Sequence, residues 1–302
     1  MRPAPSITVA AAALVIGLAG CSAGEPSATP APASDAASPS DAAQSNAPAH
    51  SSAGESSLEQ LGHIHAIDST ADGEILLASH SGLYRLDDAG TLAGPIGGDD
   101  FDGMGFTVVG SALFASGHPG SQTPAELGSP SLGIIRSDDG GQSWSPVALT
   151  SEADFHVLTA SPDGTLHGIA KRAPELLSSA DEGARWVAGT ELAAVDLAAT
   201  DDRLFAATEQ GVQSSDDGGA SFSLLDGAPL LYTIEVLGDG SLVGVDTSGV
   251  VQLQTADGWE RLGSVDGAGA LGVVGDDRIL AVDDRGIVEI TGGDAVVLTP
   301  FD

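Results

Sequence analysis

A glycine followed by a short apolar segment recurs through most of the chain, and this repeat restricts the fold more than any other feature. The six copies are on average about 41 residues apart, and one of them lacks the glycine. A period of about 40–45 residues is typical of a four-stranded blade of a β-propeller. The copies are Gly82-Leu-Tyr-Arg-Leu, Gly133-Ile-Ile-Arg-Ser, Glu175-Leu-Leu-Ser-Ser, Gly211-Val-Gln-Ser-Ser, Gly249-Val-Val-Gln-Leu and Gly286-Ile-Val-Glu-Ile.

Each copy lies in a unit of short apolar segments that alternate with Gly, Asp and Ser turns, without helical periodicity. We expect four strands per unit, named A to D from the centre of the propeller outward, with the repeated segment as strand C. A two-sheet sandwich does not explain six evenly spaced copies. The sequence therefore predicts an all-β fold over residues 58–302, a six-bladed β-propeller of four-stranded antiparallel blades.

The hairpins expected between strands C and D carry a second motif, S-x-D-x-G-x-x-[WF]. It resembles the Asp boxes, or BNR repeats, of sialidases, sortilin-type receptors and photosystem assembly propellers. The resemblance implies a structural role, in which the carboxylate accepts turn N–H groups, the glycine takes a positive φ and the aromatic ring packs between blades. Because this hairpin occurs in unrelated activities, it does not indicate a function. The structural residues are Ser137, Asp139, Gly141, Trp144, Ser179, Asp181, Gly183, Trp186, Ser215, Asp217, Gly219 and Phe222.

The N-terminal residues predict a targeting signal. Arg2 precedes an apolar run, Ile7 to Leu18, that is shorter than the ~20 residues needed to span a bilayer. The run ends in Leu18-Ala-Gly-Cys21, which resembles the lipobox of bacterial lipoproteins. The resemblance implies a signal peptide over residues 1–21, lipidation of Cys21, and an extracytoplasmic protein anchored to the cell membrane. Residues 22–57 contain no large apolar side chain, so we expect a disordered tether.

Charge and composition exclude several classes of function. The formal net charge is −33 and the chain has one lysine, which argues against nucleic-acid binding. That lysine, Lys171, lies outside any P-loop motif, and one cysteine cannot form a disulfide framework or a multi-cysteine metal site. Many of the acids belong to turns. We expect a monomer.

Five histidines are expected on one face of the propeller. Strand A begins, and strand B ends, on the face that carries the D–A and B–C loops, and all five lie at those ends. Converging imidazoles with Asp154 and Met104 nearby would suit Cu or Zn, and three are enough for a zinc site. The alternative is that the histidines bind loop backbones, and Met104 itself is expected in the core. The histidines are His63, His65, His80, His118 and His156.

Acids on the same face leave a second function open. Asp154, Glu209 and Asp246 could supply the carboxylate pair of a glycoside hydrolase, and Tyr232 could act as a sialidase-like nucleophile beside Glu209. A true sialidase also needs an arginine cluster, and most arginines are expected elsewhere. These four residues are therefore alternative catalytic candidates.

Several phrases resemble those of bacterial envelope propellers labelled glycosylhydrolases by fold analogy: Gly62 to Ala66, Met104 to Gly110, Ser116 to Pro119 and Asp154 to His156. The resemblance implies no established catalytic residue. The expected function is a membrane-anchored module that binds a metal, a small molecule or an envelope protein through the histidine face. An insertion from Gly117 to Ser131 is expected to cover that face as a flap.

Overall fold

The computed structural model describes residues 55–171, 173–267 and 269–301. The predicted signal peptide over residues 1–21, the lipidated Cys21 and the tether up to residue 54 lie outside the described residues. Among the described residues, no helix is long and apolar enough to cross a membrane.

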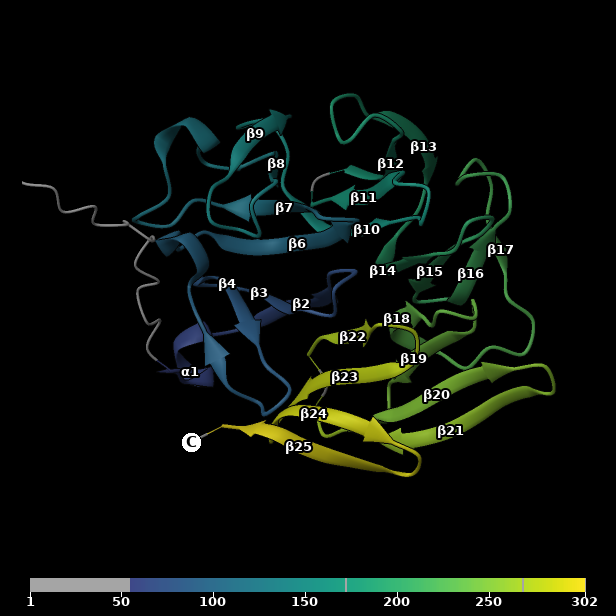
Figure 1. Cartoon of the computed structure of the whole chain (residues 1–302). Helices are drawn as coiled ribbons and strands as arrows, with labels where there is room; N and C mark the ends of the chain where they lie inside the picture. The colour runs from purple at the N-terminus through teal and green to yellow at the C-terminus, as the bar shows by residue number, and fades with distance from the viewer. Residues whose placement is uncertain (1–54, 172, 268, 302) are drawn as a thin grey trace, which may run out of the picture. The chain divides into compact units, whose positions relative to one another are not determined.

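Six antiparallel sheets surround a central channel, which confirms the predicted six-bladed β-propeller (Figure 1). Each blade is built from consecutive residues. The inner strands, predicted as A, are β2 (Ile64–Ser69), β6 (Asp102–Val109), β10 (Phe155–Ala160), β14 (Ala194–Ala199), β18 (Leu231–Val236) and β22 (Leu271–Val274). The second strands are β3 (Ile75–Ser79), β7 (Ala112–His118), β11 (Leu166–Ala170), β15 (Leu204–Thr208), β19 (Leu242–Asp246) and β23 (Arg278–Asp283).

The repeated segment forms the third strand of every blade, and the outer strands follow the polar hairpins. The third strands are β4 (Gly82–Leu86), β8 (Ile134–Ser137), β12 (Ala173–Ser179), β16 (Gly211–Ser215), β20 (Val250–Thr255) and β24 (Gly286–Thr291). The outer strands are β5 (Leu92–Ala93), β9 (Ser145–Ala148), β13 (Val187–Glu191), β17 (Ser223–Leu224), β21 (Gly258–Ser264) and β25 (Asp294–Pro300).

The first blade departs from four strands, because β1 (Glu55–Ser56) pairs with β5 as a fifth, outermost strand. These two residues belong to the segment 22–57 that we expected to be disordered. The short helix α1 (Leu58–Leu61) follows, and its buried Leu58 and Leu61 pack into the core of blade 1. Two 3-10 turns, η1 (Ile96–Gly98) and η2 (Ala125–Leu127), lie in connections.

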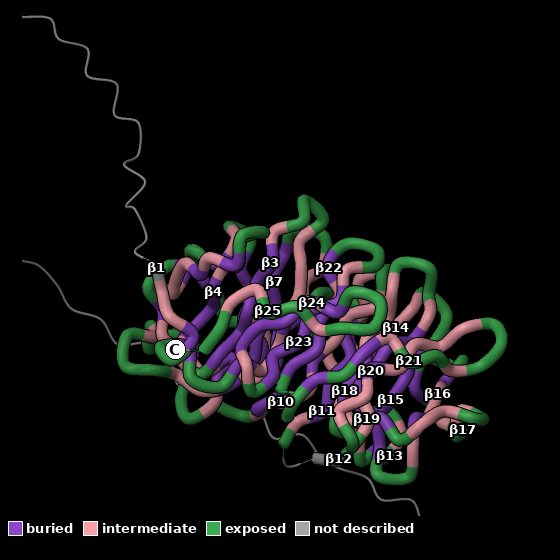
Figure 2. Tube along the Cα trace, turned by 90° about the horizontal axis from the view of Figure 1, so that it is seen from below, coloured by how far each residue is buried: buried purple, intermediate pink, exposed green. Residues whose placement is uncertain are grey.

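The core lies between neighbouring blades, where the second and third strands are the most buried (Figure 2). One cluster joins the first and last blades: Ile67 and Leu77 pack with Leu280 and Ile287. A Cβ on Gly272 of β22 would lie 2.5 Å from the carbonyl oxygen of Ile67, so only glycine allows this approach. The ring is thus closed by packing of side chains and backbone between β22 and β2.

The S-x-D-x-G hairpins join the third and outer strands on the face opposite the histidines. In the first, Ser137 Oγ donates to Asp139 Oδ1 at 2.8 Å and accepts from Gly141 N at 2.8 Å, while Asp139 Oδ1 accepts from Ser143 N at 2.9 Å. Trp144 is 8% exposed and packs edge-on against Phe101 at 5.3 Å. The same serine and aspartate bonds recur in the hairpins at Ser179, Asp181 and Gly183, and at Ser215, Asp217 and Gly219.

Candidate functional site

The channel along the propeller axis has a volume of about 700 Å³ and is lined by residues of all six inner strands. Gly105 and Gly272 let two inner strands approach the backbone of their neighbours, at Phe155 and Ile67. Three of the histidines that the sequence singled out, His63, His65 and His156, line this channel, and His80 and His118 lie beside them.

A β-bulge occurs near the loop-face end of five inner strands, and it decides which side chains reach the channel. The pairing register shifts by one residue in β2, β6, β10, β14 and β18, which leaves one extra residue in each. A bulge turns the extra side chain away from the alternating pattern of the strand. The five extra residues all line the channel: His65, Met104, His156, Val195 and Tyr232.

Three histidines of blade 1 form the first cluster, which we call triad 1: His63, His65 and His80. Their ligand atoms lie within 4.8 Å of one another. His63 Nδ1 and His65 Nδ1 are 3.3 Å apart, and the rings of His65 and His80 are 4.7 Å apart between centroids. Asp102, from the start of β6, approaches His65 Nε2 at 3.4 Å and His80 Nε2 at 3.8 Å.

Triad 2 joins blades 2 and 3 through His118, Asp154 and His156, whose ligand atoms also lie within 4.8 Å of one another. Asp154 Oδ2 is 2.9 Å from His156 Nε2 and 3.2 Å from His118 Nε2. Asp154 is 8% exposed. The next residue, Phe155, donates its N–H to the buried Ser116 Oγ at 3.0 Å, which fixes the backbone beside the carboxylate.

The hydrogen bonds around His118 leave a cation position between two electron-rich atoms. His118 Nδ1 is 3.0 Å from the carbonyl oxygen of Pro130, and because a carbonyl only accepts, Nδ1 carries the proton. Neutral His118 then directs the lone pair of Nε2 at the Asp154 carboxylate. A second proton or a metal ion between Nε2 and Oδ2 removes this repulsion.

Unsatisfied polar atoms mark both triads. His65 Nε2 and Asp102 Oδ1 are buried and face each other at 3.4 Å without forming a hydrogen bond, and the buried Asp154 Oδ1 has no hydrogen-bond partner among the described residues. Burial and the neighbouring His63, His80 and His156 lower the pKa of His65 to about 4, so its imidazole is neutral at pH 7. Buried polar atoms without partners are rare, and neutral imidazoles with carboxylates are the ordinary donor set for zinc and copper. Either group could hold a metal ion.

The five predicted histidines thus reach the loop face as two triads rather than as one cluster. Asp102 was missed by sequence reasoning. It occupies in β6 the position, two residues before the extra residue of the bulge, that His63 and Asp154 occupy in blades 1 and 3. Aligning the three inner strands on their bulges would have found it. Met104, expected in the core, is half-buried and lines the channel.

The insertion from Gly117 to Ser131 is anchored rather than arranged as a free flap. The Asp100 carboxylate accepts from Ser121 N at 2.9 Å, Ser121 Oγ at 2.8 Å and Gln122 N at 2.7 Å. Leu127 is fully buried in the core of blades 1 and 2. The loop contacts the His118 ring through the carbonyl oxygen of Pro130, and so helps to orient one side chain of triad 2.

Two of the alternative catalytic residues, Asp246 and Tyr232, lie outside the two triads. Asp246 Oδ1 accepts from Ser248 N and Val250 N at 2.8 and 3.0 Å, and these bonds, acting against burial, keep its pKa low. Tyr232 lies close to Asp246, and burial together with that charge raises the pKa of the phenol. A raised pKa works against a phenolate nucleophile. His167, placed by the sequence away from the face, is buried between Ser161 and Ser178.

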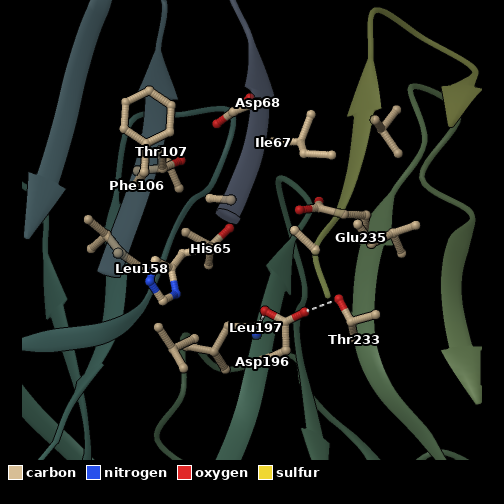
Figure 3. A pocket seen from close by; sticks show the side chains of 18 of the residues that line it. His65, Ile67, Asp68, Phe106, Thr107, Leu158, Asp196, Leu197, Thr233 and Glu235 are labelled. Atoms are coloured by element: carbon tan, nitrogen blue, oxygen red, sulfur yellow. Dashed lines mark hydrogen bonds between the residues drawn. The ribbon is translucent and has the colours of Figure 1, made fainter. Parts of the chain in front are cut away.

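Three carboxyl groups, those of Asp68, Asp196 and Glu235, line the channel (Figure 3). Asp68 Oδ2 accepts from Val108 N of the next blade at 2.8 Å, and Asp196 Oδ2 accepts from Thr233 Oγ1 at 2.8 Å in the same manner. Burial raises the pKa of Asp68 and of Asp196 to about 6. Burial and these two charges raise the pKa of Glu235 well above its ordinary value.

Glu235→Gln is expected to stabilise the protein at pH 8 and to leave its stability unchanged at pH 4. The raised pKa means that folded Glu235 binds a proton that the unfolded chain releases, so this contribution is present below about pH 4.5 and is lost as pH rises through the folded pKa. We expect a gain of about 1–2 kcal/mol at pH 8, measured by urea unfolding. Glu260→Gln, at an exposed site on β21, is the control. A gain that is equal at both pH values would contradict the prediction.

Comparisons with known proteins support the fold alone. No family model and no curated protein matches the chain. A structure of YCF48 bound to D1 peptide is 16% identical, with a TM-score of 0.51 over 80% of this chain and 83% of that one. A gluconolactonase from Xanthomonas campestris is 13% identical, with a TM-score of 0.53 over 76% and 85%. A GH74 enzyme from Niastella koreensis is 16% identical, with a TM-score of 0.51 over 73% of this chain and 40% of its own. These propellers include a binding protein and enzymes, so the shared fold does not distinguish between the two.

Proposed function

We propose that this protein is a metal-binding module of the cell envelope, held at the membrane as a lipoprotein, that takes up Cu or Zn ions through the histidines at its channel mouth. The observation that carries the proposal is the facing pair in triad 2, where His118 Nε2 and Asp154 Oδ2 lie 3.2 Å apart while His118 Nδ1 binds a carbonyl. The Leu18-Ala-Gly-Cys21 sequence supports the location.

The chemistry of the mouth favours a metal ion over a proton as the resident cation. Neutral imidazoles bind metals without competition from protons, and the low pKa of His65 keeps this residue of triad 1 in that form at pH 7. Asp154 is 8% exposed, and its Oδ1 has no partner, so it retains ligand capacity after contacting both histidines. Second-shell bonds such as His118 to Pro130 fix ring orientation, as is usual for metal-binding histidines.

Glycoside hydrolysis is the weaker proposal. It needs two carboxyl groups free to face one sugar, one of them with a raised pKa. Asp246 binds its own turn and has a lowered pKa, while Asp154 contacts two histidines. The acids with raised pKa values, Asp68, Asp196 and Glu235, line the channel (Figure 3), where Asp68 and Asp196 each accept a backbone N–H of the next blade.

The test is a titration of the purified metal-free protein with Zn²⁺, Cu²⁺ and Cu⁺ at pH 7, followed by metal analysis after gel filtration. We expect at least one retained ion per chain with micromolar or tighter affinity, and a loss of at least about 100-fold for the double variant His65→Ala and His156→Ala. His50→Ala, in the segment assigned to the tether, is the matched control. Failure to retain any of these ions at micromolar concentration would overturn the proposal.

A further inference from the structure

We infer that the channel mouth is selective for copper(I), and that the thioether of Met104 provides this selectivity as a ligand shared with the imidazoles on either side. The inference rests on the proposed function and names the ion that the same site prefers. It depends on where the bulges place one sulfur atom.

Met104 occupies the same structural position as two of the metal-binding histidines. It is the extra residue of the β6 bulge, as His65 is in β2 and His156 is in β10. All three side chains line the channel. Because β6 is the inner strand of blade 2, its extra residue stands between those of blades 1 and 3 in the ring. The order around the mouth is therefore imidazole, thioether, imidazole.

The strands that carry these residues approach closely at that level. A Cβ on Gly105, the residue after Met104, would lie 2.7 Å from the carbonyl oxygen of Phe155, the residue before His156. On the other side, Asp102 of β6 reaches His65 Nε2 at 3.4 Å. Met104 thus has one triad on each side.

Packing does not explain why a methionine occupies this position. The buried clusters between blades are formed by other residues, and Met104 is half-buried with its side chain in the channel lining. The remaining extra residues, Val195 and Tyr232, show that the position accepts side chains of different size and polarity. A methionine is therefore not required there by shape.

The donor set distinguishes between metal ions. Thioether sulfur is a soft ligand that copper(I) accepts, whereas zinc takes thiolate, imidazole and carboxylate. Each triad with its imidazoles could hold either metal. A thioether between the triads increases the affinity for copper(I) and not for zinc. Met104 therefore makes the site selective for copper(I), whereas the imidazoles and carboxylates bind both ions.

The sulfur content of the chain makes the inference directly testable. Sulfur is confined to Met1, Cys21 and Met104. In the full chain carrying Cys21→Ser, loaded with copper(I) under anaerobic reducing conditions, we expect X-ray absorption to show a Cu–S contribution that disappears in Met104→Leu. We expect Met104→Leu to weaken copper(I) binding at least about tenfold, by competition with a chromogenic chelator, and to change Zn²⁺ affinity less than twofold.

Val195→Leu is the matched control, because it alters the extra residue of another bulge in the same ring and should change neither affinity. A copper(I)-loaded Cys21→Ser protein with no Cu–S contribution overturns the inference even if Met104→Leu does not fold. Equal loss of copper(I) and zinc in a folded Met104→Leu also overturns it and leaves the proposed function standing. Binding of neither metal by any form overturns the proposed function, and this inference with it.

Discussion

Phe155→Ala is expected to lower the free energy of unfolding by about 3–5 kcal/mol, the usual cost of removing a buried phenylalanine. Phe155 is fully buried between blades 2 and 3, and its ring lies 4.9 Å from that of Trp186 in the second S-x-D-x-G hairpin. Gly168 packs so closely that an added Cβ would lie 2.6 Å from the Phe155 ring. The substitution therefore opens a cavity that the tightly held backbone cannot fill. Urea unfolding followed by tryptophan fluorescence measures the effect.

Phe301→Ala is the control for Phe155→Ala. Phe301 is 38% exposed at the end of the described chain and should lose less than about 1 kcal/mol. A comparable loss in both variants would mean that Phe155 does not have the packing described. Because Phe155 separates Asp154 from His156, we also expect the folded variant to bind metal more weakly at triad 2.

Gly117→Ala is expected to destabilise the protein by about 2–6 kcal/mol and to weaken metal binding at both triads. Gly117 has a φ of 145°, and an added Cβ would lie 1.9 Å from the carbonyl oxygen of Asp102. Backbone strain and overpacking each cost about 1–3 kcal/mol. Relief requires β6 and β7 to move apart, which displaces Asp102 from triad 1 and His118 from triad 2. Urea unfolding and metal titration together measure both effects.

Gly110→Ala is the control for Gly117→Ala, because it has the cost of a positive φ without the close contact of the added Cβ. Gly110 also has a positive φ, 62°, but nothing lies within 4 Å of the Cβ it would gain. We expect a loss of about 1 kcal/mol, from backbone strain alone, and unchanged metal affinity. If Gly117→Ala behaved like Gly110→Ala, the contact between β6 and β7 would have no role in holding the triads.

The fold could be predicted from the sequence because each blade repeats the same order of strands and turns. Strand, turn and hairpin signals recur with one period, so an error in one unit is corrected by the other five. The glycine at the start of strand C and the serine and aspartate of each hairpin act within a few residues. Local interactions of this kind are visible in the sequence without knowledge of tertiary contacts.

The sequence predicts on which face of the propeller the site lies, but not how the residues of the site are grouped. Strand direction places His63, His65, His80, His118 and His156 on the loop face, since that follows from topology alone. Their division into two triads depends on bulges, and a bulge changes the facing of one side chain without leaving a signal in the alternating pattern. Asp102 was missed for the same reason.

The channel carboxyl groups were also not apparent from the sequence. Asp68, Asp196 and Glu235 lie within apolar strands, where an acidic residue would ordinarily face solvent. Their positions become clear only when the blades meet, because Asp68 and Asp196 bind backbone N–H groups of the next blade. Such contacts between residues about 40 positions apart have no local signature.

The way the ring closes places both triads in blades that are joined by the continuous chain. Among the described residues, no strand of the last blade comes from the first part of the chain, so blades 1 and 6 are held together across their junction without an interlocking strand. At that junction, unlike at the others in the described ring, the two neighbouring blades are not consecutive in the chain. Triad 1 and Asp102 span blades 1 and 2, and triad 2 spans blades 2 and 3, where the chain is continuous. An opening of the ring between β22 and β2 would therefore leave intact the chain connections between the blades that carry the two triads.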